Sequence, residues 1–320
     1  MHASIASPCL RILRLAVCLA WAGAFAAPPA QAADFTVLLA DDEPAHVEFA
    51  RLLRDADEAQ DDGSVAVGVR TRGLRAPSAA PTPVTVTVAV GATAARAALD
   101  RPGAEVLLLA MLSRLDYESL KTSPGLRRTD RRVGVLLRDP APADALAVID
   151  AVLPHKRRLG TVVTAEAQPL VRELERAAAG WDLQVQYTPD ATSLATALRT
   201  LVSRSDALIV LPGLIGDDQA ATLAVLRAGA GAGLPVFGTN EGLVRSGGLA
   251  AAVSTPARLA QQARAMAQKL ARGGATMGGS GVLVESALPA TVRVNATVAL
   301  ALGLRLPDER ELTARVNAAR

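Results

Sequence analysis

The residues best suited to ligand contact follow a short apolar run near the middle of the second half of the chain. The run from Val236 to Gly238 is followed directly by Thr239, Asn240 and Glu241. In an open α/β sheet, ligands bind outside the carboxyl ends of the strands, so polar side chains at such an end are candidates for ligand contact. The alternative is that these three residues form a turn and cap the next helix.

A second candidate is the junction at residues 91–93. Gly91, Ala92 and Thr93 follow an apolar run that ends at Val90, and a helix is expected to begin there. Glycine permits a tight turn, and the free N–H groups at a helix start attract a carboxylate or phosphate. Ligand contact and a plain turn are both compatible with this pattern.

One further apolar run ends in a proline and a glycine. Pro212 and Gly213 end the run that begins near residue 207, and we include both among the candidate ligand contacts. The acids that follow, Asp217 and Asp218, suit the start of a helix, and we expect them to cap it.

Two adjacent acids, Asp41 and Asp42, follow the first apolar run of the folded chain, at residues 35–39. They could cap the helix expected from Ala45, where the helix dipole favours negative charge, or contact a ligand. Metal binding is the least favoured of the three readings, and we predict no metal site.

Catalytic patterns are absent from the sequence after residue 32. Both cysteines, Cys9 and Cys18, precede that point, and only His46 and His155 follow it. We expect both histidines to have surface roles, because neither has a serine or an acid at triad-like spacing. No Gly-x-Ser-x-Gly elbow and no Cys/His zinc pattern occur. The sequence therefore predicts a protein that is not an enzyme and has no cofactor.

Short Val/Leu/Ile runs alternate with stretches of helical periodicity from residue 34 onward. Uninterrupted apolar runs are typical of strands that are buried on both faces of a parallel sheet, so the order predicts a doubly wound α/β fold. A stretch rich in proline and glycine at residues 70–83 is expected to be an exposed loop. Strands are expected over residues 35–39, 84–90, 106–109, 133–137, 158–163, 183–187, 207–211, 236–238 and 250–254, and helices over 45–56, 92–99, 143–153, 169–179, 193–203, 217–228 and 256–272.

The first 32 residues have the pattern of a signal peptide. Arg11 and Arg14 precede an apolar run over residues 15–27, and Ala30-Gln31-Ala32 fits a cleavage site after Ala32. The apolar run is shorter than the ~20 residues of a membrane-spanning helix. We therefore expect export to the periplasm without a lipid anchor. A net charge of +3 argues against nucleic acid as a partner.

Four stretches between residues 130 and 312 resemble the periplasmic substrate-binding proteins of ABC transporters, in the branch that includes tryptophan- and tyrosine-type binders. They are residues 153–160 (Leu-Pro-His-Lys-Arg-Arg-Leu-Gly), 233–239 (Gly-Leu-Pro-Val-Phe-Gly-Thr), 244–251 (Val-Arg-Ser-Gly-Gly-Leu-Ala-Ala) and 294–307, which ends in Leu-Gly-Leu-Arg-Leu-Pro. The first part of the chain is less similar to the family. The similarity that it has lies chiefly in residues 90–94.

This resemblance implies a type I periplasmic binding-protein fold, in which two Rossmann-like doubly wound lobes are joined by a hinge and hold a ligand in the cleft between them. Lobe 1 would take residues 33–130 and a returning helix at 255–275, and lobe 2 would take 131–254 and 276–320. We expect the chain to cross between the lobes at 122–132, at 273–281 and near Ser254.

The function implied is capture of a small ligand and its presentation to an inner-membrane ABC permease. An alternative is a periplasmic sensory or accessory protein that works with a sensor kinase or a TonB-dependent receptor. An enzyme on the same scaffold is disfavoured by the absent catalytic residues. Only six aromatic residues follow residue 32, so we expect a small ligand that bears a carboxylate and an aliphatic or polar part.

Overall fold

A computed structural model describes residues 34–58, 85–103, 106–190, 193–273 and 281–319. The chain divides into two units, Met1–Ala32 and Ala33–Arg320, and both β-sheets lie in the second unit. The expected signal peptide lies outside the described residues, as does the loop expected at 70–83. In the described part of the chain, no helix is both long and apolar enough to cross a membrane.

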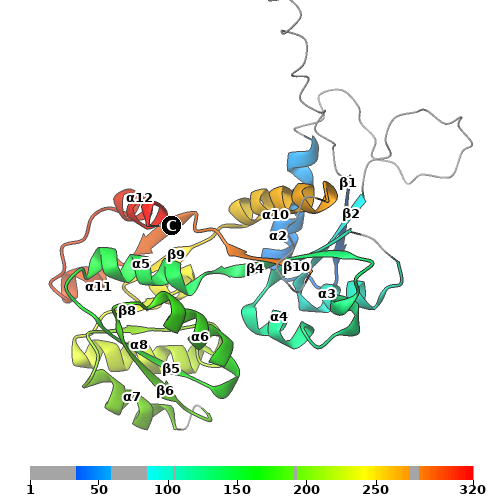
Figure 1. The fold of residues 1–320 in the computed structure, drawn as a ribbon. Helices are drawn as coiled ribbons and strands as arrows, with labels where there is room; N and C mark the ends of the chain where they lie inside the picture. Colours follow the sequence, from blue (N-terminus) through cyan, green and yellow to red (C-terminus); the bar gives the residue numbers. More distant parts are fainter. Residues whose placement is uncertain (1–33, 59–84, 104–105, 191–192, 274–280, 320) are drawn as a thin grey trace, which may run out of the picture. The chain divides into compact units, whose positions relative to one another are not determined.

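The first of two sheets has five parallel strands (Figure 1). Their order across the sheet is β1-β2-β3-β4-β10, so the last strand comes from a distant part of the chain. The strands are β1 (Asp34–Leu39), β2 (Thr85–Val90), β3 (Val106–Leu112), β4 (Arg132–Pro140) and β10 (Val282–Ala287).

Helices cover both faces of this sheet. Alternate residues of β2 point to opposite faces, with Val86, Val88 and Val90 in one cluster and Ala89 in the other. The first cluster packs under α2 (Pro44–Glu58) and α10 (Pro256–Ala271), which contact each other and lie side by side in Figure 1. The second packs under α3 (Gly91–Asp100) and α4 (Arg114–Leu120), and the short helix η2 (Pro124–Arg127) follows α4.

The second sheet has six strands in the order β11-β9-β8-β7-β5-β6. All neighbours are parallel except β11, which runs antiparallel to β9. The strands are β5 (Arg158–Val163), β6 (Asp182–Tyr187), β7 (Ala207–Ile209), β8 (Val236–Gly238), β9 (Ala250–Val253) and β11 (Thr291–Val294).

Two apolar clusters, one on each face, join this sheet to its helices. Leu159 and Val163 of β5 belong to one cluster and Val162 to the other, as the alternation of a strand requires. The helices are α5 (Pro142–Val152), η3 (Ala165–Ala167), α6 (Gln168–Ala177), α7 (Leu194–Val202), α8 (Gln219–Ala232), α9 (Glu241–Arg245), α11 (Ala296–Ala301) and α12 (Glu309–Ala318).

The chain passes between the sheets after β4, after β9 and after β10. The crossing near Ser254 agrees with the expected one. Residues 122–132 are not a crossing, because they connect α4 to β4 on the first sheet; their polar composition belongs to a surface connection that includes η2. Most of the third expected crossing, residues 274–280, lies outside the described residues, and the observed crossing follows β10.

Two strands depart from the expected lobe bounds. β4 pairs with β3, and β10 pairs with β4, so both belong to the first sheet although residues 131–254 and 276–320 were assigned to lobe 2. The physical reason is strand pairing: β10 pairs along β4, which makes β4 an interior strand and leaves β10 at the edge of the sheet. The helix α10 packs on the first sheet, where it contacts β3 and β4. The domain bounds as a whole remain a prediction.

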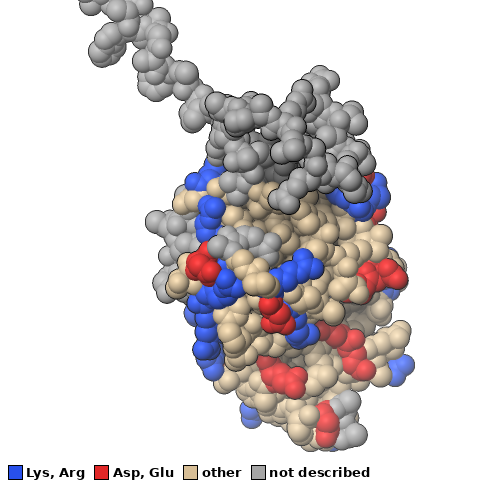
Figure 2. Space-filling model, turned by 90° about the vertical axis from the view of Figure 1, so that its right-hand side faces the viewer, with Lys and Arg blue, Asp and Glu red and all other residues tan. Residues whose placement is uncertain are grey.

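Charged side chains of both signs occur on the face drawn in Figure 2, with other residues between them. This distribution is consistent with the small net charge of the chain.

Candidate ligand-binding site

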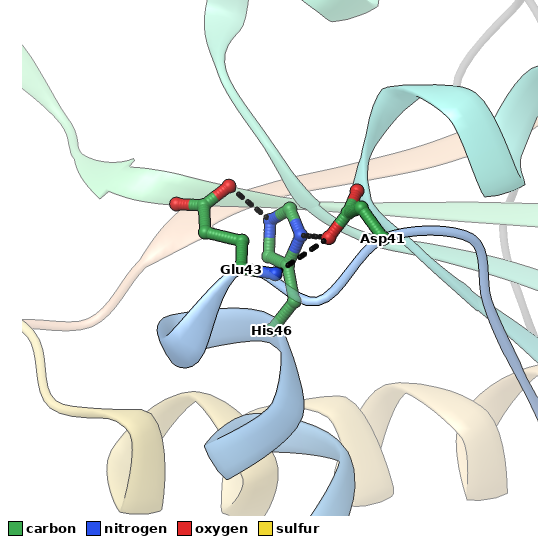
Figure 3. Close-up of side chains that lie close together, drawn as sticks. All are labelled: Asp41, Glu43 and His46. Carbon is green, nitrogen blue, oxygen red and sulfur yellow. Dashed lines mark hydrogen bonds and ion pairs between the residues drawn. The ribbon is translucent and has the colours of Figure 1, made fainter.

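A buried histidine organises the carboxyl edge of the first sheet. The side chain of His46, in the first turn of α2, is only 6% exposed, and its Nδ1 lies 2.7 Å from Asp41 Oδ1. Figure 3 shows the ring between Asp41 on one side and Glu43 on the other. The expectation of a surface role for His46 is therefore wrong; the apolar packing of α2 against the sheet turns this residue inward. His155, by contrast, is exposed as expected.

Asp41 is held in place by two donors. His46 Nδ1 donates to its Oδ1, and the backbone N–H of Glu43 donates to the same oxygen at 3.3 Å. The hydrogen bond from His46 is the main reason that the pKa of Asp41 lies below its ordinary value. Asp41 therefore holds the segment that enters α2. Its neighbour Asp42 is exposed.

Gly91 lies directly behind the imidazole of His46. A Cβ at Gly91 would lie 2.7 Å from His46 Cε1 and 3.3 Å from Asp41 Oδ2, and the backbone there has φ of +82°. Both the close approach and the positive φ favour glycine. The structure thus brings together two predicted site residues, Asp41 and Gly91, around a histidine that the sequence reasoning did not select.

The start of α3 has no side-chain cap. Val90 is its N-cap residue and makes no side-chain hydrogen bond, while Thr93 in the first turn is exposed. The first N–H groups of a helix need partners from outside it, and they carry partial positive charge. On the adjoining strand, Met111 has φ of +60° at a register shift in β3, a conformation that costs energy for a non-glycine residue and often marks functional sites.

The strand order of the second sheet reverses at β5, although β5 is parallel to both of its neighbours, β6 and β7. β6 lies on one side of β5, whereas β7, β8 and β9 continue on the other side. A crevice at such a switch point is the usual ligand position in doubly wound sheets. The predicted residues Pro212 and Gly213 follow β7 at this point, and both are buried. Thr164 follows β5; it is 5% exposed, and its Oγ1 has no hydrogen-bond partner among the described residues.

Gly213 also lies where helices of the two sheets meet. A Cβ on Gly213, whose φ is +125°, would lie 3.2 Å from Leu115 Cδ1 in α4. In the same region Arg114 of α4 forms an ion pair with Glu173 of α6, and both side chains are largely buried. The loop after β7 therefore lies close to an element of the first sheet. No local pattern in the sequence indicates the Arg114–Glu173 pair, because its members are distant in the chain.

The three polar residues after β8 have different roles. Asn240 accepts a hydrogen bond from Leu243 N at 2.8 Å and is the N-cap of α9, so the capping alternative holds for its side chain. Thr239 is 7% exposed. Glu241 lies 3.8 Å from Arg293 Nε, at the edge of the sheet. Asp218 caps α8 by accepting from Ala221 N at 2.7 Å, as expected, while Asp217 accepts from Gly213 N at 3.1 Å.

Asp139 at the end of β4 is an additional buried acid that sequence reasoning missed. Its side chain is 19% exposed, its Oδ2 has no hydrogen-bond partner among the described residues, and Arg138 Nε lies 3.7 Å away. Burial raises the pKa of Asp139 to about 6, opposed by Arg138 and reinforced by Asp217 and Asp116. Asp217 belongs to the loop after β7, so the pKa of Asp139 on the first sheet is also raised by a charge on the second sheet.

Two open surface cavities lie among the elements of the second sheet. One, of about 510 Å³, lies between α7 and α8, and the other, of about 290 Å³, lies between α9, β11 and the start of α12 and includes Glu241. Neither of these two cavities is lined by residues of both sheets. Contact of the predicted site residues with a ligand therefore remains a prediction.

Two helix-flanked, mainly parallel sheets joined by several chain crossings define an α/β fold with two parallel-sheet lobes, as predicted. The family model for the ABC transporter substrate-binding protein matches residues 134–315, which is more than half of the chain. The chain therefore belongs to the ABC transporter substrate-binding protein family. It is a binding protein that captures a small ligand for an ABC transporter, and it is not an enzyme.

Solved structures show the same fold at low sequence identity. One is a protein from Streptococcus pneumoniae in complex with L-Trp, with 15% identity, 89% of this chain and 98% of that chain covered, and a TM-score of 0.51. Another is a ligand-free, open substrate-binding protein with adhesive properties from Clostridium difficile, with 16% identity, coverage of 86% and 96%, and a TM-score of 0.60. A conserved domain protein from Vibrio cholerae has 19% identity, coverage of 89% and 98%, and a TM-score of 0.52. No curated protein matches the sequence.

Proposed function

We propose that this protein is a periplasmic receptor that binds a small carboxylate-bearing ligand between its two lobes and presents it to an inner-membrane ABC permease. The observation that carries the choice of a carboxylate is the uncapped start of α3 at the carboxyl edge of the first sheet. Its first-turn amides, at Gly91, Ala92 and Thr93, would donate to the ligand's anionic group.

The second sheet supplies the opposite side of the proposed site. Pro212, Gly213 and Thr164 lie at the switch point, and Thr164 Oγ1 would gain a partner from a polar group of the ligand. Thr239 follows the next strand and completes this edge. The contacts of α4 with Gly213 and with α6 bring elements of both sheets close together, which supports a site between the lobes.

A negative charge placed at Thr93 tests directly whether the ligand bears a carboxylate that binds at the start of α3. In Thr93→Asp, the new carboxylate would occupy the first turn of α3, stabilise the helix and repel an anionic ligand. We expect the variant to fold normally and to bind at least tenfold more weakly. Thr93→Asn, which has nearly the same shape and no charge, is the matched control and should keep most of the affinity.

The ligand would be found by a thermal-shift screen against amino acids, small organic acids and sugars, because a ligand that binds only the folded state raises the melting temperature. Isothermal titration of the best compound would then compare the parent with the two Thr93 variants. Equal affinity of Thr93→Asp and the parent, or selection of an uncharged sugar, would exclude the proposed recognition of a carboxylate.

The location and the partner need separate tests. Periplasmic fractionation and N-terminal sequencing should find the protein outside the cytoplasm and starting at Ala33, if the leader is cleaved after Ala32. Copurification with a permease on addition of ligand would support delivery to a transporter. Recovery of a sensor kinase or a TonB-dependent receptor instead would favour the accessory role.

A further inference from the structure

The cluster of Asp41, Glu43 and His46 has the geometry of a metal site, although the sequence predicted none. One potential ligand atom from each residue lies within 4.8 Å of the others. His46 is the central member, and its Nε2 has no hydrogen-bond partner among the described residues although the side chain is only 6% exposed. A buried ring nitrogen without a partner is costly, and such atoms call for an explanation.

The distances separate the two sides of the ring. Asp41 Oδ1 lies 2.7 Å from Nδ1, which is a hydrogen bond. Glu43 Oε2 lies 3.5 Å from Nε2. Two ligand atoms on one tetrahedral zinc ion lie about 3.3–3.5 Å apart, given metal–nitrogen and metal–oxygen bonds of about 2.0–2.2 Å. The side of the ring that faces Glu43 therefore has the spacing of a ligand pair.

We propose that Glu43 and His46 Nε2 bind a divalent transition-metal ion, of which Zn²⁺ is the best match, and that Asp41 orients the imidazole through Nδ1. A carboxylate on the second nitrogen of a ligating histidine fixes its tautomer and raises its basicity. Imidazole and carboxylate are both ligands that zinc accepts. Two protein ligands leave two positions of a tetrahedral ion for water or for a donor group of another molecule.

The surroundings hold the cluster in this arrangement. Gly91 packs against the ring so closely that a Cβ there would lie 3.0 Å from Nδ1, which limits rotation of the imidazole. The start of α2 contributes roughly half a positive charge, which opposes a cation. The carboxyl groups of Asp41 and Glu43 lie on the two sides of the ring and supply oxygen ligands that attract a cation.

Zinc titration of the purified full chain tests the site without any organic ligand, so its result does not depend on the proposed function. The protein would carry a removable tag that lacks histidine and would first be treated with a chelator. We expect one Zn²⁺ per chain and at least a tenfold loss of affinity in Glu43→Gln and in His46→Gln. Glu48→Gln on the same helix and His155→Gln on the surface are the matched controls and should bind as the parent does.

Asp41 acts as a positioning residue, and its variants separate that role from direct ligation. Asp41→Asn keeps an oxygen that accepts from Nδ1, so it should retain more zinc affinity than Asp41→Ala, which should lose about 10–100-fold. Circular dichroism would show whether each variant folds. If His46→Gln does not fold, the zinc affinity of Glu43→Gln tests the proposal alone, because the side chain of Glu43 is half exposed and its replacement should not disturb the fold. Failure of the parent to bind Zn²⁺, equal binding by Glu43→Gln, or an equal loss in His155→Gln would overturn the proposal.

Discussion

Replacing Asp139 with asparagine should stabilise the protein at neutral pH and not in acid. Burial raises the pKa of this carboxyl from 3.8 to about 6, with Asp217 and Asp116 acting in the same direction and Arg138 against it. Below pH 3.8 the group is protonated in both the folded and the unfolded state. Between pH 3.8 and 6 only the folded state keeps the proton, so stability falls as the pH rises.

The size of the effect follows from that shift. A shift from 3.8 to about 6 corresponds to at most about 3 kcal/mol of destabilisation above pH 6, at about 1.36 kcal/mol for each pH unit. The partial exposure of the side chain, 19%, lowers the expected value. Asparagine is similar in shape to the protonated acid and cannot ionise, so Asp139→Asn should be free of this cost.

Urea unfolding followed by circular dichroism at pH 4, 5, 6 and 7 measures the difference between Asp139→Asn and the parent. We expect the advantage of the variant to grow by about 1–3 kcal/mol across this range. Asp206→Asn is the control, because the hydrogen bonds from Arg158 lower the pKa of Asp206 to about 2, so this variant should be less stable than the parent by an amount that stays nearly constant from pH 4 to 7. Its parent carboxylate stabilises the protein above pH 3.8, and this contribution is lost as the pH falls toward 2. A difference for Asp139→Asn that does not change with pH would refute the reasoning.

Two other changes test contacts between distant segments. Arg131 is 3% exposed and donates hydrogen bonds to the backbone carbonyls of Ala98, Leu99, Arg101 and Gly103. Lysine lacks the planar guanidinium group, so Arg131→Lys should lower the free energy of unfolding by about 1–3 kcal/mol, as measured by urea unfolding. An unchanged urea midpoint would contradict this. The pair Arg114–Glu173 joins α4 to α6, and a double-mutant cycle with Arg114→Met and Glu173→Met should give a coupling energy of about 1 kcal/mol or more, whereas additive losses would show that the pair contributes nothing.

The candidate site was predictable only in part. The apolar runs locate the strand ends, so Gly91, Pro212 and Gly213 could be selected from the sequence, although their contact with a ligand stays a prediction. His46, Thr164 and Asp139 were missed. Each is a common polar residue in an amphipathic or charged stretch, and its burial comes from neighbours elsewhere in the chain. Asn240 was placed at the correct strand end, but the local hydrogen bond to Leu243 N occupies its side-chain oxygen.

The sequence by itself determined the succession of strands and helices, because each depends on residues close together in the chain. β5 at Arg158–Val163 and β8 at Val236–Gly238 have the predicted bounds. Helix α8 ends at Gly233, which has the left-handed conformation that glycine adopts readily at a helix C-terminus. The same local patterns were sufficient to indicate the family.

Only the tertiary structure decided which sheet each strand joins and which polar groups become buried. Val282 of β10 pairs with Val133 of β4 across nearly half the chain, and this pairing places both strands in the first sheet. Strand partners are selected by register and by the apolar faces that the helices cover, and neither is visible in a local pattern. The same packing places His46 between Asp41 and Glu43, where its chemistry depends on neighbours that helical periodicity alone does not reveal.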